Sequence, residues 1–141
     1  MKQLDRWFRL ATYLAIVGWL LLVLGPHWAS LPTVLSVVVV GMLCAVYVWL
    51  LVVVRPADVE SPRGSFFTLS GVVRLFSNPR AVLVGWVHIL AFDLMVALWV
   101  RADAAHHDVG HAWLIPIYAL TMMFGPAGLL AYFALRLILG A

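Results

Sequence analysis

Two ionisable side chains stand in a long apolar stretch and are the first candidates for chemistry. Asp93 and His88 are the only ionisable residues between positions 81 and 100. A charged carboxyl in hydrocarbon costs on the order of 3 kcal/mol, so such a residue normally faces a bundle interior or a water-filled cavity. Carboxyl and imidazole groups also serve as general acids and bases in enzymes. The pair therefore predicts proton transfer within a membrane.

The spacing of the pair allows a shared cavity but not a shared helix face. The two residues are five positions apart, which on an α-helix means about 140° of rotation and roughly 7.5 Å of rise. Each residue also has a purely structural interpretation. His88 could make only an interhelical hydrogen bond, and Asp93 could be bonded to Thr121 or Tyr118 of a later helix.

The elements that must position this pair are membrane helices. Hydrophobic residues make up 65% of the 141 residues and the mean hydropathy is +1.06, whereas soluble proteins are roughly half apolar. There is room for four helices of ~20 residues, one loop and little else. We therefore expect a single all-α transmembrane domain over 1–141 with no soluble catalytic module. Its spans are predicted at about 8–25, 31–54, 79–101 and 112–138, with a loop at 55–78.

Local signals mark the boundaries of these elements. Ser77 or Asn78 can cap the third span, and Pro79 fits its first turn without losing a hydrogen bond. Residues 124–128 contain a proline between glycines and should kink or locally unwind the fourth span. Within the loop, the apolar residues of Ser65–Phe76 fall close to one helical face. This segment is either a short interfacial helix on the membrane surface or a connector packed across the bundle.

Basic residues lie mainly on one side of the predicted spans. The positive-inside rule therefore places both termini and the 55–79 loop in the cytoplasm, and we expect a bacterial inner membrane. The apolar run up to Leu24 exceeds the ~7–15 residues of a signal-peptide core, so the first span should be retained. No nucleic-acid partner is expected, because the basic residues flank apolar runs and form no single patch. The cytoplasmic set is Lys2, Arg6, Arg9, Arg55, Arg63, Arg74 and Arg80, whereas the loop after the third span holds only Arg101.

The remaining histidines and aromatic residues have more than one interpretation. His107 and His111 have the spacing of a metal-ligand pair on a helix, but short polar loops often carry histidines, so no metal site is expected. Haem between spans would need two intramembrane histidines, and only His88 qualifies. Aromatic side chains mark membrane interfaces or lipid-facing surface, or else line a slot for a long apolar ligand. The candidate ligand-contacting residues are Trp86, Phe92, Trp99, Tyr118, Phe124, Gly125 and Pro126.

Two segments of the third and fourth spans carry a family resemblance. Gly85–Leu94 has the sequence GWVHILAFDL, and Met123–Leu130 has the sequence MFGPAGLL. A His-x-x-x-x-Asp-Leu helix paired with a Gly-Pro-x-Gly helix resembles the abscisic-acid-deficient-four-like family of membrane proteins. The likeness is strong over about 78–135, including the ten-residue interval from Asp93 to Asp103, and generic over the first two spans.

The resemblance implies a function and a set of residues. In plants this family is tied to making neoxanthin from violaxanthin, in which an epoxide opens and an allene forms at one carotenoid end ring. The resemblance implies a four-helix protein that handles such an isoprenoid, with His88, Asp93 and Asp103 as the positions to carry over. The isomerisation is redox-neutral and needs acid and base groups, so no cofactor is expected. The family commonly has arginine five residues after the aspartate, where this chain has Leu98; Arg101 would compensate only in part.

Three hypotheses follow for the function. The first is a cofactor-free isomerase or epoxide-opening enzyme that acts on a carotenoid or another isoprenoid. The second is a non-catalytic protein that binds a pigment or lipid or supports a membrane complex, in which Gly125 and Gly128 only let helices pack closely. The third is a transporter or channel, which is disfavoured because no inverted repeat is visible. The bilayer and an apolar ligand are the expected partners, and a homo-oligomer is compatible with each hypothesis.

Overall fold

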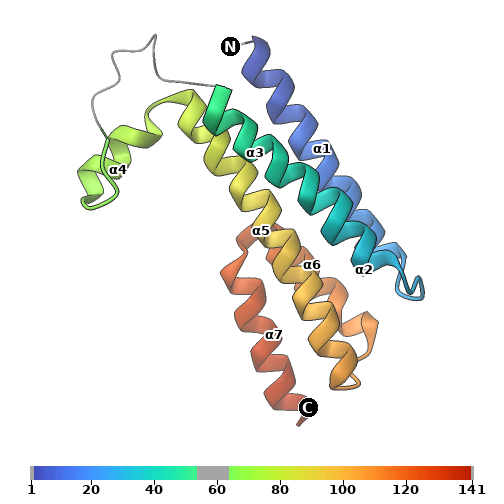
Figure 1. Ribbon diagram of the computed structural model, residues 1–141. Coiled ribbons are helices and arrows are strands. Elements are labelled where there is room, and N and C mark those ends of the chain that lie inside the picture. Colours follow the sequence, from blue (N-terminus) through green and yellow to red (C-terminus); the bar gives the residue numbers. More distant parts are fainter. Residues whose placement is uncertain (1, 54–63, 141) are drawn as a thin grey trace.

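The computed structural model describes residues 2–53 and 64–140, and all regular structure in that part of the chain is helical (Figure 1). Three helices are long and apolar enough to cross a membrane. In chain order the elements are α1 (Lys2–Leu24), α2 (Leu31–Val34), the π-helix η1 (Leu35–Val40), α3 (Gly41–Val53), α4 (Leu69–Phe76), α5 (Pro79–His106), α6 (His111–Phe124) and α7 (Pro126–Leu139).

The first three predicted spans correspond to the three long apolar helices. They are Lys2–Leu24, the continuous helical segment Leu31–Val52, and Pro79–His106. Helix α5 is central, since it packs against α1, α3 and α6. Its 28 residues extend roughly 42 Å, more than the hydrocarbon thickness of a bilayer. These apolar helices indicate a membrane protein, and α5 is the element that positions both His88 and Asp93.

The predicted start of α5 and the predicted loop helix are both present. Asn78 is the N-cap of α5, where its Oδ1 accepts a hydrogen bond from the Arg80 backbone N–H at 2.9 Å. Helix α4 begins after Thr68, whose hydroxyl accepts from the Gly71 N–H at 3.1 Å. Its location at a membrane surface stays a prediction. Most of the remaining predicted loop, residues 54–63, lies outside the described part of the chain.

The predicted fourth span over 112–138 is wrong as a single helix. The chain reverses at Gly125, which has φ +32° and ψ −88°. Pro126 has no N–H with which to continue the α6 hydrogen-bond ladder, so it begins a new helix instead. Helices α6 and α7 then pack side by side in opposite directions (Figure 1). The predicted local unwinding is therefore real, but it produces a full reversal.

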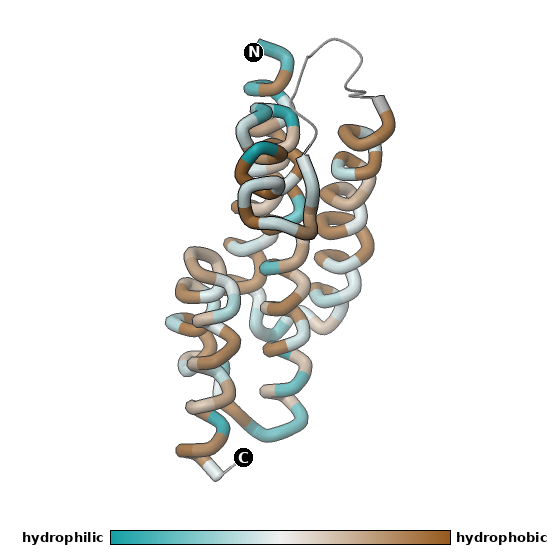
Figure 2. The backbone as a smooth tube through the Cα atoms, turned by 90° about the vertical axis from the view of Figure 1, so that its left-hand side faces the viewer, coloured by the Kyte–Doolittle hydropathy of each residue, from teal (hydrophilic) through white to brown (hydrophobic). Residues whose placement is uncertain are grey.

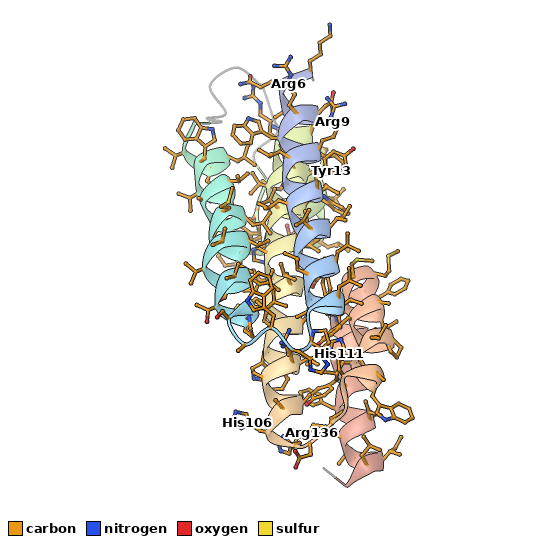
Figure 3. All side chains as sticks on the ribbon, turned by 90° about the vertical axis from the view of Figure 1, so that its right-hand side faces the viewer. Arg6, Arg9, Tyr13, His106, His111 and Arg136 are labelled. Carbon is orange, nitrogen blue, oxygen red and sulfur yellow. The ribbon has the colours of Figure 1, made fainter. Side chains whose placement is uncertain are left out.

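This reversal also changes the placement of the chain ends. Figures 1 and 2 mark the two ends of the chain at opposite ends of the bundle. Arg6 and Arg9 lie near the first end, whereas His106 and Arg136 lie near the second (Figure 3). The prediction that both termini share one side of the membrane assumed a fourth complete crossing. Without that crossing, the structure does not support it.

Candidate acid–base site and the adjoining cavity

Asp93 lies in the middle of α5, directly beside the turn between α6 and α7. The side chain is half-buried, and a Cβ atom added to Gly125 would come within 2.6 Å of the Asp93 Oδ1. Gly125 is also the N-cap residue of α7. The carboxyl therefore lies beside the N-terminal end of α7. Only a residue without a side chain allows the turn to approach it this closely.

The structural interpretation of Asp93 as a bonded packing residue is not what the structure describes. Among the described residues, no hydrogen bond to its carboxyl is present. The Thr121 hydroxyl donates instead to the Ile117 carbonyl at 2.8 Å. The Tyr118 hydroxyl is buried and has no partner in the described chain. Asp93 therefore keeps its hydrogen-bonding capacity for a ligand, a water molecule or another chain.

His88 is exposed and held by aromatic rings. Its imidazole stacks on Phe92 with centroids 4.4 Å apart, and Tyr47 of α3 lies 5.9 Å away. The stacked contact with Phe92 uses a face of the imidazole ring, and no described residue hydrogen-bonds to the imidazole nitrogen atoms. The interhelical hydrogen bond considered for His88 is absent from the described part of the chain. Such an arrangement suits a group that must exchange a proton, because neither nitrogen is committed.

A cavity of about 500 Å³ opens beside His88, between α3, α4 and α5. This volume lies within the range of small-molecule sites, roughly 300–1,000 Å³. Most of the wall is apolar, with His88 at one end and the polar residues Asn78 and Arg80 near the start of α5. Asp93 is not part of the wall. The remaining lining residues are Tyr47, Leu50, Leu51, Phe66, Leu75, Phe76, Ala81, Val84 and Gly85.

The candidate ligand-contacting residues do not form one slot. Trp86 lies on the α1 side of α5, where its Nε1–H donates to the Thr12 hydroxyl at 3.1 Å. Trp99 packs edge-on against Tyr132 of α7, with centroids 6.1 Å apart. Tyr118 is buried beside His111. Phe92 and Phe124 are exposed, and Gly125 and Pro126 form the turn.

Asp103, the third carried-over position, belongs to a separate polar cluster at the far end of α5. Its Oδ2 accepts from the Tyr132 hydroxyl at 2.6 Å and from Nη1 of Arg136 at 3.0 Å. Nη2 of Arg136 also donates to Nε2 of His107 at 2.6 Å. Because guanidinium has no acceptor, this Nε2 must be unprotonated. His107 then carries its proton on Nδ1 and donates it to the Asp103 carbonyl at 2.8 Å.

This cluster contains residues that the sequence analysis did not assign to a site. His107 is neutral in this arrangement, so the 3.7 Å approach of its Nδ1 to the Asp103 carboxyl is not an ion pair. Tyr132 and Arg136 are four residues apart, and a lone arginine within an apolar run was the available signal. Their partner could not be named from sequence, because the meeting depends on the reversal at Gly125.

Arg101 and His111 hold the C-terminal end of α1 and the loop that follows it. The Arg101 guanidinium donates to the carbonyls of Gly25 and Pro26 at 3.3 and 3.0 Å. The Nε2 of His111 lies 2.9 Å from the Val23 carbonyl. Arg101 therefore does not replace the arginine expected near Asp93, at the position of the buried Leu98. His107 and His111 contact different partners, and the described residues contain no group of three or more metal-ligating side chains.

Comparisons with known proteins agree on a family. The model of ABA DEFICIENT 4-like proteins matches residues 6–132. Protein ABA DEFICIENT 4 of Arabidopsis thaliana, a chloroplastic protein, is 27% identical over 71 residues, 50% of this chain and 31% of that protein. No solved structure matches. The expected bacterial inner membrane gains no support, since that relative is chloroplastic. Because the family match covers most of the sequence, this chain belongs to the ABA DEFICIENT 4-like family, as the resemblance predicted.

Proposed function

We propose that this membrane protein binds one end of a carotenoid or a similar isoprenoid and rearranges it by proton transfer, without a redox cofactor. The observation that carries the proposal is the position of His88. It lies in the wall of a largely apolar cavity of about 500 Å³, about 1.4 helical turns from the Asp93 carboxyl. An apolar part of the ligand would occupy the cavity, and the reacting end ring would lie within reach of both His88 and Asp93. The remainder of a long ligand would lie among the lipid chains.

The chemistry asked of the two residues is a balanced exchange of protons. In the opening of an allylic epoxide to an allenic alcohol, one proton leaves a carbon and one proton is added to the epoxide oxygen. The product is an isomer of the substrate, so no electrons are gained or lost. In this proposal Asp93 supplies the proton to oxygen as general acid, and His88 accepts the proton from carbon or passes it back. General acid–base groups of this kind contribute about 10²–10⁴-fold to a rate.

Family membership supports the class of ligand. The family resemblance is tied to carotenoid modification, and the matched region includes both His88 and Asp93. The aligned segment covers less than a third of the length of the Arabidopsis relative. The activity of a complete relative therefore enters this proposal only as an analogy. The local geometry must be tested on this chain itself.

Pigment analysis tests the proposal directly. The protein is expressed in cells that make epoxy carotenoids, and pigments are separated by chromatography. We expect a new isomeric pigment with the wild type, and about a 10²-fold or greater loss of it with Asp93→Asn. His88→Ala should lower the yield as well, whereas the exposed His106 provides a matched control, His106→Ala. An unchanged pigment profile with well-expressed wild-type protein contradicts the proposal.

A non-catalytic binding protein is the second candidate, and one observation favours it. Asp93 is absent from the cavity wall and lies against Gly125, so its carboxyl could serve only to hold the turn. In that case purified protein carries a pigment or lipid but does not change it. Asp93→Asn would then lower the melting temperature or the amount of co-purified ligand, without changing its identity. Mass spectrometry of the co-purified small molecule separates the two candidates.

A further inference from the structure

We propose that α6 and α7 form a re-entrant hairpin, which enters and leaves the membrane on the same side, and that Asp103 is the positioning residue at its base. Each helix has 14 residues, which is roughly 21 Å and less than the ~30 Å of a hydrocarbon core. The turn at Gly125 meets Asp93, which lies near the middle of the 28-residue α5. The tip therefore reaches about the midplane.

The turn at the tip of the hairpin must be covered by protein. Non-helical backbone at membrane depth occurs only where protein buries it or where it lines a polar cavity. Gly128 brings the start of α7 so close to α6 that an added Cβ would collide with the backbone and hydroxyl of Thr121. On the other side, the Asp93 carboxyl covers Gly125. The backbone at Gly125 and Gly128 is thus buried by α5 and by the two arms of the hairpin, whereas the Phe124 side chain at the tip is exposed.

The base of the hairpin is fixed by the polar cluster around Asp103. This carboxyl binds Tyr132 and Arg136 on successive turns of α7. His107, at the end of α5, accepts a further hydrogen bond from Arg136. These contacts fix how far α7 can slide along α5. Since α7 begins at the turn, the same contacts set the position of Gly125 against Asp93.

The distribution of charge agrees with this topology. The N-terminal end of the bundle carries Lys2, Arg6 and Arg9, and α4 and the start of α5 lie at that same end (Figure 1). Arg136 lies at the opposite end (Figure 3), where its charge is offset by Asp103 at 3.0 Å. Lys and Arg residues near the ends of the spans favour the cytoplasmic side. Among the described residues the far end carries fewer of them, Arg101 and Arg136, which agrees with a C-terminal end on the other side.

Single cysteine substitutions test the topology. They are introduced into a Cys44→Ala variant, because Cys44 is the one cysteine of the sequence. Gln3→Cys reports the N-terminal end, His106→Cys reports the far end of α5, and Ile138→Cys reports the end of α7; all three positions are exposed. A membrane-impermeant maleimide is added to right-side-out and inside-out vesicles. We expect Ile138→Cys to react from the same side as His106→Cys and opposite to Gln3→Cys. Reaction from the same side as Gln3→Cys overturns the re-entrant hairpin.

Spin labels test the positioning role of Asp103. Labels are placed at Met123, near the tip, and at Ile89 on α5, both exposed. We expect Asp103→Asn to broaden the distance distribution well below the melting temperature, and Asp103→Glu to restore much of it. The matched control is Asp108→Asn in the adjoining loop. A purely structural role would lower the melting temperature without changing the distribution, and that result overturns the assignment. Neither measurement depends on a ligand or on turnover, so both stand apart from the proposed function.

Discussion

The two halves of α5 are held in different ways. The second half, from Asp93 to His106, is fastened by directed polar contacts, with Arg101 on the loop after α1 and Asp103 on α7. The described contacts of the first half include a polar cap at Asn78 and a side-chain hydrogen bond from Trp86 to α1. On its other side the first half borders a cavity, where the contacts to α3 and α4 are mostly apolar.

This difference has a physical cause. Lipid chains are as apolar as leucine, so apolar contact alone gives helices little reason to prefer each other over lipid. Directed hydrogen bonds and close packing must therefore fix the relative position of membrane helices. The fastened half can hold the turn at Gly125 within contact of Asp93. The first half borders the cavity and leaves space for an apolar ligand. His88 lies in this first half and Asp93 in the second.

The largest effect on stability is expected from closing the space within the hairpin. In Gly128→Ala the new methyl group meets the backbone and hydroxyl of Thr121. Overpacking typically costs 1–3 kcal/mol, and backbone cannot yield as a side chain can, so we expect about 3 kcal/mol of lost unfolding free energy. The control is Gly41→Ala, where the nearest atom lies 3.9 Å away and higher helix propensity should leave stability unchanged or slightly raised. Tryptophan fluorescence during thermal unfolding in detergent measures both; equal melting temperatures would contradict the tight hairpin.

A smaller loss of unfolding free energy is expected from breaking the ion pair between Arg136 and Asp103 at the base of the hairpin. Arg136→Gln leaves the Asp103 carboxyl with the Tyr132 hydroxyl as its remaining partner from α7. Hydrogen bonds to charged groups contribute about 1.5–3 kcal/mol, and the partial exposure of both side chains favours the lower value.

A double-mutant cycle with Asp103→Asn isolates the pairwise interaction. We expect the double variant to be less destabilised than the sum of the two single variants. If the two effects add, the contact at 3.0 Å contributes no interaction energy, and the hairpin base is held by other contacts.

A smaller loss of unfolding free energy is expected when the Tyr132 hydroxyl is removed from the cluster. Tyr132→Phe removes the hydroxyl that donates to Asp103 at 2.6 Å and keeps the ring that packs against Trp99. We expect a loss of about 1 kcal/mol in unfolding free energy, because one hydrogen bond is lost and the carboxyl keeps Arg136 as a partner. Tyr13→Phe on α1 is the control, since the Tyr13 side chain is 63% exposed and its loss should change stability little. If the unfolding free energy of Tyr132→Phe falls no more than that of Tyr13→Phe, the Tyr132 hydroxyl does not stabilise the cluster.

The sequence predicts the long apolar helices well but not the hairpin. Hydropathy and length decide whether a segment forms a membrane helix, and α1, the Leu31–Val52 segment and α5 agree with the predictions. By the same two criteria, residues 112–138 form one apolar run that is long enough to span a membrane. Hydropathy cannot register that Gly125 takes a positive φ. The same residue composition is compatible with a kink and with a full reversal, and tertiary packing decides which of the two forms.

The candidate site was predictable in part for the same reason. A lone carboxyl and a lone imidazole in an apolar run identify Asp93 and His88 as exceptional residues, whatever the arrangement of the helices. The carboxyl contacts of Asp103 depend on where α7 lies, so its two partners on α7, Tyr132 and Arg136, could not be assigned from spacing. The cavity beside His88 depends likewise on α4, which approaches α5 only through tertiary packing.

The smallest effect on stability, and a large effect on ligand, is expected from filling the cavity. Ala81 lines the cavity on the first half of α5. In Ala81→Phe the new ring can enter open space, so we expect the unfolding free energy to change by less than about 0.5 kcal/mol. The co-purified isoprenoid should fall at least tenfold, because the ring occupies the volume that the ligand needs. Ala102→Phe, at an exposed position on the fastened half, is the matched control and should retain the ligand.

Mass spectrometry of organic extracts from equal amounts of the two proteins gives the comparison. Equal ligand in both variants would show that the cavity between α3, α4 and α5 is not where the ligand binds. The exposed side chains of Phe92 and Phe124 would then be the next positions to substitute. Loss of ligand in Ala81→Phe alone would tie binding to the half of α5 that borders this cavity.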